Sequence, residues 1–150
     1  MLDFNRIQDK VNNDAAEVRV KVKLTNSIDE GLIYRGYLKP SDLHVYETTA
    51  LVDTSSVRAV IPMEVAQKLG LRIRSEQVAK CTDDRQETFE IAGSVLIEIQ
   101  GRETSEEPLV GGDEILIGRI ALETLGFVVD IENHRLIPNP KHPDGPVFRI

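Results

Sequence analysis

The chain has 150 residues, 41% hydrophobic and 29% charged, which is the size and composition of one globular domain. Its net charge of −7 disfavours a surface that binds nucleic acid or anionic lipid, and its one cysteine, Cys81, excludes an internal disulfide. Because no apolar run approaches the about 20 residues that span a bilayer and MLDFNRIQDK lacks the apolar core of a secretory signal, we expect a cytoplasmic protein.

The first half of the chain predicts short strands and one helix. Residues 1–16 carry little periodicity, so we expect a loosely ordered lead-in. Apolar and polar residues alternate from Val18 to Leu24, as in a half-buried strand. Turn residues follow from 26 to 31, residues 34–46 show no clear pattern, and the β-prone run Thr48–Val52 ends at Asp53. A buried strand at Val57–Ile61 then precedes a short helix, Pro62–Leu69, which Gly70 ends.

The second half predicts further strands and a second helix. A long alternation runs from Phe89 to Ile99 with a bend at Gly93, and a charged turn follows at 102–107. Leu109–Val110 and Ile115–Ile117 read as short buried strands, and Arg119–Leu125 is a short helix with Gly126 as its C-cap. Phe127–Ile131 and Arg135–Pro138 form a hairpin. We therefore predict one mainly β domain over 17–138, closed or sandwiched, with two short helices and an exposed tail, 139–150.

Two segments stand out when they are considered together. The first, residues 50–62, is ALVDTSSVRAVIP, and the second, residues 115–119, is ILIGR and opens the helix Arg119–Leu125. The pair resembles the retropepsin-like (retroviral-type) aspartic protease family, particularly its small stand-alone bacterial members. The resemblance extends from about Thr48 to Pro138. It implies a closed acid-protease barrel with one lobe per chain.

The resemblance also implies an activity and a set of site residues. Asp53 would be the catalytic aspartate, Thr54 would lock two loops together through its hydroxyl, and Ser55 completes the triplet. Gly118 and Arg119 would support the loop. Two carboxylates held about 3 Å apart share one proton, and the pair activates a water against the scissile carbonyl. Because this chain holds one such motif, we expect a homodimer in which each subunit contributes Asp53, acting as an aspartic endopeptidase on polypeptides without metal or cofactor.

Position 55 departs from the family pattern, which has Gly there. Ser adds a Cβ and a hydroxyl where the backbone approaches the carboxylates. A negative φ lets Ser55 fit and donate a further hydrogen bond, whereas a positive φ strains the loop. If Ser55 crowds the site, Ser55→Gly should raise cleavage about tenfold. The alternative function is a weakened or inactive module of the same fold, used for dimerisation or peptide binding.

A substrate-covering hairpin is expected between the two motifs, over residues 78–86. Its tip would bring Thr82, Asp83, Asp84 and Arg85 to the substrate, although an ordinary exposed turn without substrate contact is the simpler interpretation of such a sequence.

Three other chemistries have weaker signals. A thiol protease would need a His beside Cys81, but His44, His134 and His142 lie in polar, turn-like contexts. A zinc site needs more clustered His and Cys residues than the chain provides. Gly111-Gly112 precedes no Gly-Lys-Ser/Thr, so it is not a phosphate loop. A structural β-barrel unrelated to proteases also stays open.

Overall fold

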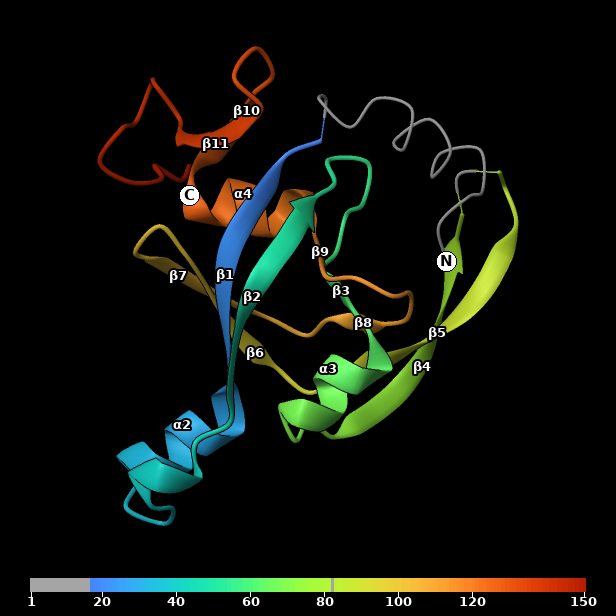
Figure 1. The fold of residues 1–150 in the computed structure, drawn as a ribbon, viewed down its shortest axis with the longest axis vertical. Coiled ribbons are helices and arrows are strands. Elements are labelled where there is room, and N and C mark those ends of the chain that lie inside the picture. The colour runs from blue at the N-terminus through green and yellow to red at the C-terminus, as the bar shows by residue number, and fades with distance from the viewer. Residues whose placement is uncertain (1–16, 82) are drawn as a thin grey trace.

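The computed structural model describes residues 17–81 and 83–150, and Figure 1 shows their path. The strands are β1 (Arg19–Asn26), β2 (Val45–Val52), β3 (Val60–Ile61), β4 (Ile73–Lys80), β5 (Gln86–Ala92), β6 (Val95–Ile99), β7 (Arg102–Glu106), β8 (Leu109–Val110), β9 (Leu116–Ile117), β10 (Phe127–Asp130) and β11 (Arg135–Pro138). The helices are α2 (Ser27–Tyr34), the 3-10 turn η2 (Pro40–Asp42), α3 (Met63–Lys68) and α4 (Arg119–Leu125). The predicted lead-in, 1–16, lies outside the described residues.

Most strands belong to one curved sheet with the order β4-β5-β8-β3-β9-β2-β1-β6-β7 (Figure 1). Within the described residues the two end strands, β4 and β7, do not pair with each other, so the sheet is curled but open. The hairpin β10-β11 forms a separate sheet. The prediction of a mainly β architecture is thus confirmed.

The alternation predicted from Val18 to Leu24 is present in β1. Val20, Val22 and Leu24 are buried, whereas the basic residues between them are exposed. β1 pairs in antiparallel fashion with β2 on one side and with β6 on the other. A strand in that position buries one face, which explains its period of two.

Both predicted helices are present. α3 begins after Pro62 and ends at Lys68, with Gly70 in the left-handed region at φ +62°. α4 spans Arg119–Leu125 as predicted, and Gly126 ends it at φ +76°. A side chain at either glycine would strain the backbone, so these residues act as helix stops.

The prediction of only two helices is wrong, because α2 forms where turn residues were expected. The side chain of Asn26 accepts hydrogen bonds from the N–H groups of Ile28 and Asp29, at 3.0 and 3.1 Å, and so caps the helix. No residue of α2 is buried. The helix therefore has no core-facing apolar stripe by which the sequence would indicate it. Figure 1 shows it projecting beyond the ends of β1 and β2.

Arg102–Glu106 is a strand, β7, where a charged turn was predicted. It pairs with β6 along its whole length. Nη1 of Arg102 donates to the carbonyls of Leu125 and Gly126, at 2.8 and 3.1 Å, and the guanidinium lies 4.9 Å from the ring centre of Phe127. An edge strand with polar side chains on both faces does not show the alternation of a half-buried one. β4 lacks it for the same reason, since seven of its eight residues are exposed.

The predicted strand Val57–Ile61 is shorter than expected. Only Val60–Ile61 pairs with neighbours, whereas residues 57–59 continue the loop that starts at Asp53. The alternation from Phe89 to Ile99 divides into β5 and β6 around Gly93, where a bend was predicted.

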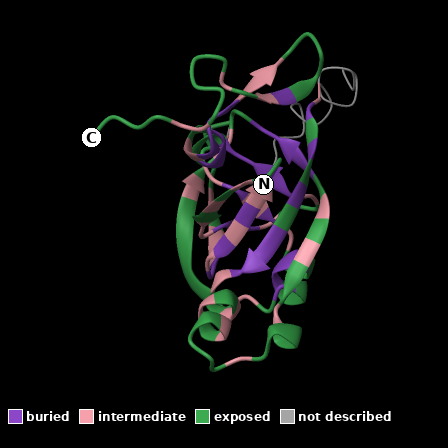
Figure 2. Cartoon of the chain, turned by 90° about the vertical axis from the view of Figure 1, so that its left-hand side faces the viewer, coloured by how far each residue is buried: buried purple, intermediate pink, exposed green. Residues whose placement is uncertain are grey.

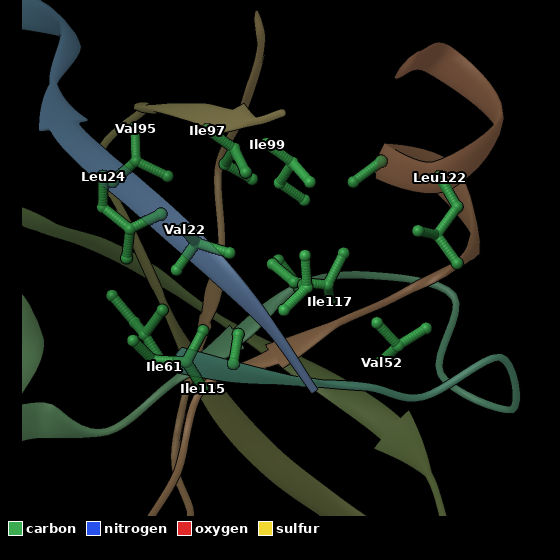
Figure 3. Packing of buried hydrophobic residues seen from close by; sticks show 14 of the residues in the cluster. Val22, Leu24, Val52, Ile61, Val95, Ile97, Ile99, Ile115, Ile117 and Leu122 are labelled. Carbon is green, nitrogen blue, oxygen red and sulfur yellow. The ribbon is translucent and has the colours of Figure 1, made fainter. Parts of the chain in front are cut away.

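One hydrophobic core lies inside the curve of the sheet (Figure 2). Side chains of β1, β6, β9 and α4 converge there, among them Val22, Ile97, Ile117 and Leu122 (Figure 3). Burying such aliphatic side chains stabilises the fold by about 1.5–3 kcal/mol each. Val52 belongs to this core, and its packing fixes the position of the backbone from which Asp53 follows.

Among the described helices, none has the length and apolar character needed to cross a membrane.

Candidate active site

Asp53 lies at the point where β2 leaves the sheet. β2 runs parallel to β9, with Val52 opposite Ile117, and the N–H of Asp53 donates to the carbonyl of Ile117 at 2.9 Å. Only 4% of the Asp53 surface is exposed. Asp53 therefore stands beside the Leu116-Ile117-Gly118 segment, where the sequence motifs predicted it.

Ser55 holds one oxygen of the Asp53 carboxylate. The Ser55 N–H donates to Oδ1 of Asp53 at 3.1 Å, and the Ser55 hydroxyl donates to the same oxygen at 2.7 Å. Ser55 is not among the described non-glycine residues with a positive φ. The φ angle of Ser55 is therefore not positive, which is the condition under which Ser fits at this position without backbone strain and donates a second hydrogen bond.

Thr54 and Ser55 are exposed beside the buried aspartate. The predicted role of the Thr54 hydroxyl, to lock two loops together, remains a prediction.

The start of α4 holds the loop that follows Asp53. The N–H groups of Arg119 and Ile120 donate to the carbonyls of Ser56 and Val57, at 2.9 and 3.1 Å. At Gly118 a Cβ would stand only 2.6–2.9 Å from three carbonyl oxygens of this loop. Gly is needed at 118 because the two backbones approach this closely. Arg119 supports the loop through its backbone, since its side chain is exposed.

The far end of the loop is held by β7. Oε2 of Glu106 accepts a hydrogen bond from the Ala59 N–H at 2.6 Å, and Oε1 of Glu106 is buried without a hydrogen-bond partner in the described part of the chain. Burial raises the pKa of Glu106, while the Ala59 hydrogen bond and the nearby charge of Arg58 act in the opposite direction. Glu106 thus joins this loop to β7, which is an end strand of the sheet.

Asp53 lines a cavity of about 340 Å³. Part of its wall comes from the loop after Asp53, part from β4 and β5, and part from residues 109–116. Several lining residues are apolar: Val57, Val60, Val78, Phe89, Leu109 and Leu116. A cavity that combines apolar walls with one buried carboxylate is suited to a peptide side chain next to a reacting bond.

The β4-β5 hairpin lines this cavity with residues that precede its tip, and contact of the tip residues with a substrate stays a prediction. Gln77, Val78, Lys80 and Cys81 line the cavity, whereas Asp83, Asp84 and Arg85 do not, and Thr82 lies outside the described residues.

The hairpin tip is a tight turn. The Cys81 N–H donates to the carbonyl of Arg85 at 2.7 Å, and Asp84 has φ +66°. Desolvation acts against ionisation of Asp83, but hydrogen bonds from Arg85 outweigh it and hold the pKa of Asp83 below its usual value. The charged tip residues thus interact with one another, and the strand before the tip forms the wall of the cavity.

Arg58 and Gln77 are among the polar residues of the cavity that the sequence motifs did not predict. Nη1 of Arg58 donates to Oε1 of Gln77 at 2.8 Å, which joins the loop after Asp53 to β4.

The weaker sequence candidates lie in other settings. Nδ1 of His44 is 2.6 Å from Oδ2 of Asp29, at the α2 end of the molecule. The Gly111 N–H donates to the carbonyl of Ile61 at 2.8 Å, and Gly111-Gly112 follows β8 in the connection to β9. Within residues 17–81 and 83–150, no group of three or more His, Cys, Asp and Glu side chains is placed to hold a metal ion.

No family model and no curated protein matches the sequence. Several solved structures are similar to the chain, including the following two. The retroviral protease-like domain of Ddi1 from Leishmania major has a TM-score of 0.48 at 16% identity, over 82% of this chain and 90% of that one. A retropepsin-like aspartic protease from Rickettsia conorii has a TM-score of 0.41 at 19% identity, over 76% of this chain and 87% of that one.

Proposed function

We propose that this protein is an aspartic endopeptidase that acts as a homodimer. The observation that carries the proposal is the setting of Asp53. Its carboxylate is buried at the edge of a largely apolar cavity, and Ser55 donates two hydrogen bonds to one of its oxygens. The loop around it is fixed from both ends by α4 and β7. A carboxylate held in this way is prepared for proton transfer rather than for a surface ion pair.

Dimerisation completes the site in this proposal. One chain supplies one such aspartate, and the aspartic-protease mechanism uses two carboxyl groups that share one proton. Thr54 and Ser55 are exposed next to Asp53, so a two-fold axis beside them would bring the two loops together. The Thr54 hydroxyls would then bond across the axis.

The reaction follows from the shared proton. One carboxylate takes a proton from water as the water oxygen attacks the scissile carbonyl carbon, and the other carboxyl gives its proton to the carbonyl oxygen. The tetrahedral intermediate collapses when the carboxyl that took the water proton gives it to the amide nitrogen, the C–N bond breaks, and a hydroxyl of the intermediate gives its proton to the other carboxylate. The two carboxyl groups return to one shared proton, and neither metal nor cofactor takes part.

The finer sequence predictions belong to this proposal. They are a closed acid-protease barrel, a domain that spans 17–138 with an exposed tail at 139–150, and a location in the cytoplasm. The curled sheet supports the first of these, since the Glu106–Ala59 hydrogen bond brings the end strand β7 to the loop before β3.

The proposal is tested by cleavage of an unstructured polypeptide between about pH 3 and 7, the range in which a carboxyl pair holds one proton. We expect Asp53→Asn to abolish cleavage while the melting temperature and the dimer stay intact, because an amide does not accept the proton of water. Asp42→Asn, an exposed control on η2, should retain full activity.

Two further measurements separate the alternatives. Activity per chain should fall on dilution as dimers dissociate, and a transition-state mimic with a central hydroxyl should bind wild type better than Asp53→Asn. Full activity of a monomer would rule out the shared pair. A stable dimer that cleaves no polypeptide, yet binds peptides, would establish the dimerisation or peptide-binding module instead.

A further inference from the structure

Arg58 lies five positions after Asp53 and lines the same cavity. Its side chain is anchored at two points. Nη1 donates to Oε1 of Gln77 on β4, and Nη2 donates to the carbonyl of Glu107 in the β7-β8 connection. A guanidinium held from two sides keeps its plane and direction before any ligand arrives, so little conformational entropy is lost on binding.

The anchored guanidinium keeps hydrogen-bonding capacity. Arginine has five N–H donors, and no other acceptor in the described part of the chain takes a hydrogen bond from Arg58. Arg58 is half-buried against apolar neighbours such as Val57 and Val60. Charge-assisted hydrogen bonds are stronger in such a setting than in open solvent.

The other charges of the cavity are balanced differently. Glu114 forms an ion pair with Arg19 at 2.7 Å, and Lys80 lies 3.3 Å from Asp84 with 67% of its side chain exposed. The remaining carboxylates of the cavity are Asp113, which is exposed, and the buried Asp53. Glu106 does not line the cavity, but its charge interacts with that of Arg58, and burial raises the pKa of Glu106. As the pH falls into the acidic range in which a carboxyl pair works, Glu106 becomes protonated at a higher pH than an ordinary glutamate does. The negative charge of Glu106 then no longer offsets the positive charge of Arg58.

We propose that Arg58 is a specificity-determining residue that binds a carboxylate of the substrate, so that the enzyme prefers peptides with Asp or Glu within a few residues of the scissile bond. This inference rests on the proposed peptidase function. The apolar walls would hold a neighbouring hydrophobic side chain while the guanidinium pairs with the acid. The net charge of −7 by itself favours the binding of basic peptides, so this preference for acidic peptides would come from Arg58 against the overall charge.

The test uses pairs of peptides that differ only by Glu or Gln, with the variable residue moved one position at a time around the cleaved bond. At one position at least, we expect wild type to cleave the Glu peptide about tenfold better in kcat/KM, which corresponds to about 1.4 kcal/mol. Arg58→Gln should reduce this ratio to about one. Lys80→Gln, which removes the other cation of the cavity, should keep the ratio.

Arg58→Lys covers the case in which Arg58→Gln does not fold. Lysine keeps the charge but not the fork of donors, so the Glu/Gln ratio should fall to about threefold. No preference for Glu in wild type, or a preference that both Arg58 variants leave unchanged, would overturn the inference.

Failure of the proposed function gives a different pattern. If wild type cleaves none of the peptides, the same Glu and Gln pairs are built as non-hydrolysable statine peptides and their binding is measured by calorimetry. A Glu preference that disappears in Arg58→Gln would keep the carboxylate site without the peptidase. Equal binding of the Glu and Gln peptides would overturn the carboxylate site at Arg58 in addition to the peptidase function.

Discussion

The two sides of the cavity are built in opposite ways. The floor, defined as loop 53–59, is fixed by backbone hydrogen bonds from α4, by a side-chain hydrogen bond to Glu106, and by Gly118 packed against its carbonyls. The roof, defined as the hairpin β4-β5, has seven exposed residues of eight in β4. β5 joins the rest of the sheet over a short stretch, through the pairs Glu90–Val110 and Ile91–Leu109 and the hydrogen bond from the Ala92 N–H to the carbonyl of Pro108.

This difference matches what each side has to do in a peptidase. A carboxylate that exchanges protons in the transition state must stay within a fraction of an ångström of its working position, which requires a locked supporting structure. A cover over an extended peptide must open to admit it, and a hairpin with few buried contacts opens at low cost. Mutations in the floor should therefore affect stability and the rate constant, whereas mutations in the roof should affect binding.

The largest effect is expected at the tightest contact of the floor. In Gly118→Ala the new Cβ would stand 2.6–2.9 Å from the carbonyls of Ser56, Val57 and Arg58, so α4 and the loop must separate. We expect a loss of about 3 kcal/mol in the free energy of unfolding, or about 10 °C in melting temperature. Thermal denaturation followed by circular dichroism measures it.

Gly31→Ala is the matched control, because a Cβ at Gly31 in α2 meets nothing within 4 Å. It should stabilise the protein slightly, by up to about 1 kcal/mol. Equal melting temperatures for the two alanine variants would show that the floor is less tightly packed than the contacts at Gly118 indicate.

The next effect concerns the hydroxyl of Ser55. Ser55→Ala removes the 2.7 Å hydrogen bond to Asp53 and keeps the backbone one. We expect kcat/KM to fall about tenfold, since a hydrogen bond to a charged group contributes about 1.5–3 kcal/mol and part of it is replaced by water. Ser55→Gly should fall by a similar amount. A rise in cleavage with Ser55→Gly would instead support the crowding hypothesis that the family pattern first suggested.

A smaller effect should separate roof from floor. Val78 on β4 lines the cavity and is 60% exposed, so Val78→Ala should change the unfolding free energy by no more than about 0.5 kcal/mol. Its lost methyl groups should raise KM roughly fourfold with little change in kcat. Steady-state kinetics measures both constants. Glu76→Ala, an exposed β4 residue that does not line the cavity, should leave both unchanged.

The smallest effect is a pH dependence at Glu106. Burial raises the pKa of Glu106, so the folded protein holds this proton more tightly than the unfolded chain does, and ionisation lowers stability as the pH rises above the ordinary range of a glutamate. Glu106→Gln should therefore stabilise the protein at pH 7, by no more than about 2 °C, and the gain should vanish at pH 4. An equal gain at both pH values would exclude ionisation as the cause.

The sequence by itself determined the parts whose pattern is local. The alternation in β1, the stop signals Gly70 and Gly126, and the helix Arg119–Leu125 are all where they were predicted, because a half-buried strand and a capped helix record their surroundings in neighbouring residues. The position of Asp53 beside Gly118 was expected instead from the resemblance of two short motifs to a known family.

Only the tertiary structure decided the parts that depend on distant residues. Asn26 caps α2 with its side-chain oxygen, and its Nδ2 donates to the carbonyl of Leu69 at 2.9 Å. These polar contacts leave no apolar period in the sequence. The edge strands β4 and β7 carry polar side chains on both faces, so no alternation marks them. Arg58 and Glu106 were missed as site residues because their partners lie 19 to 49 positions away in the sequence, and only the curl of the sheet brings them together.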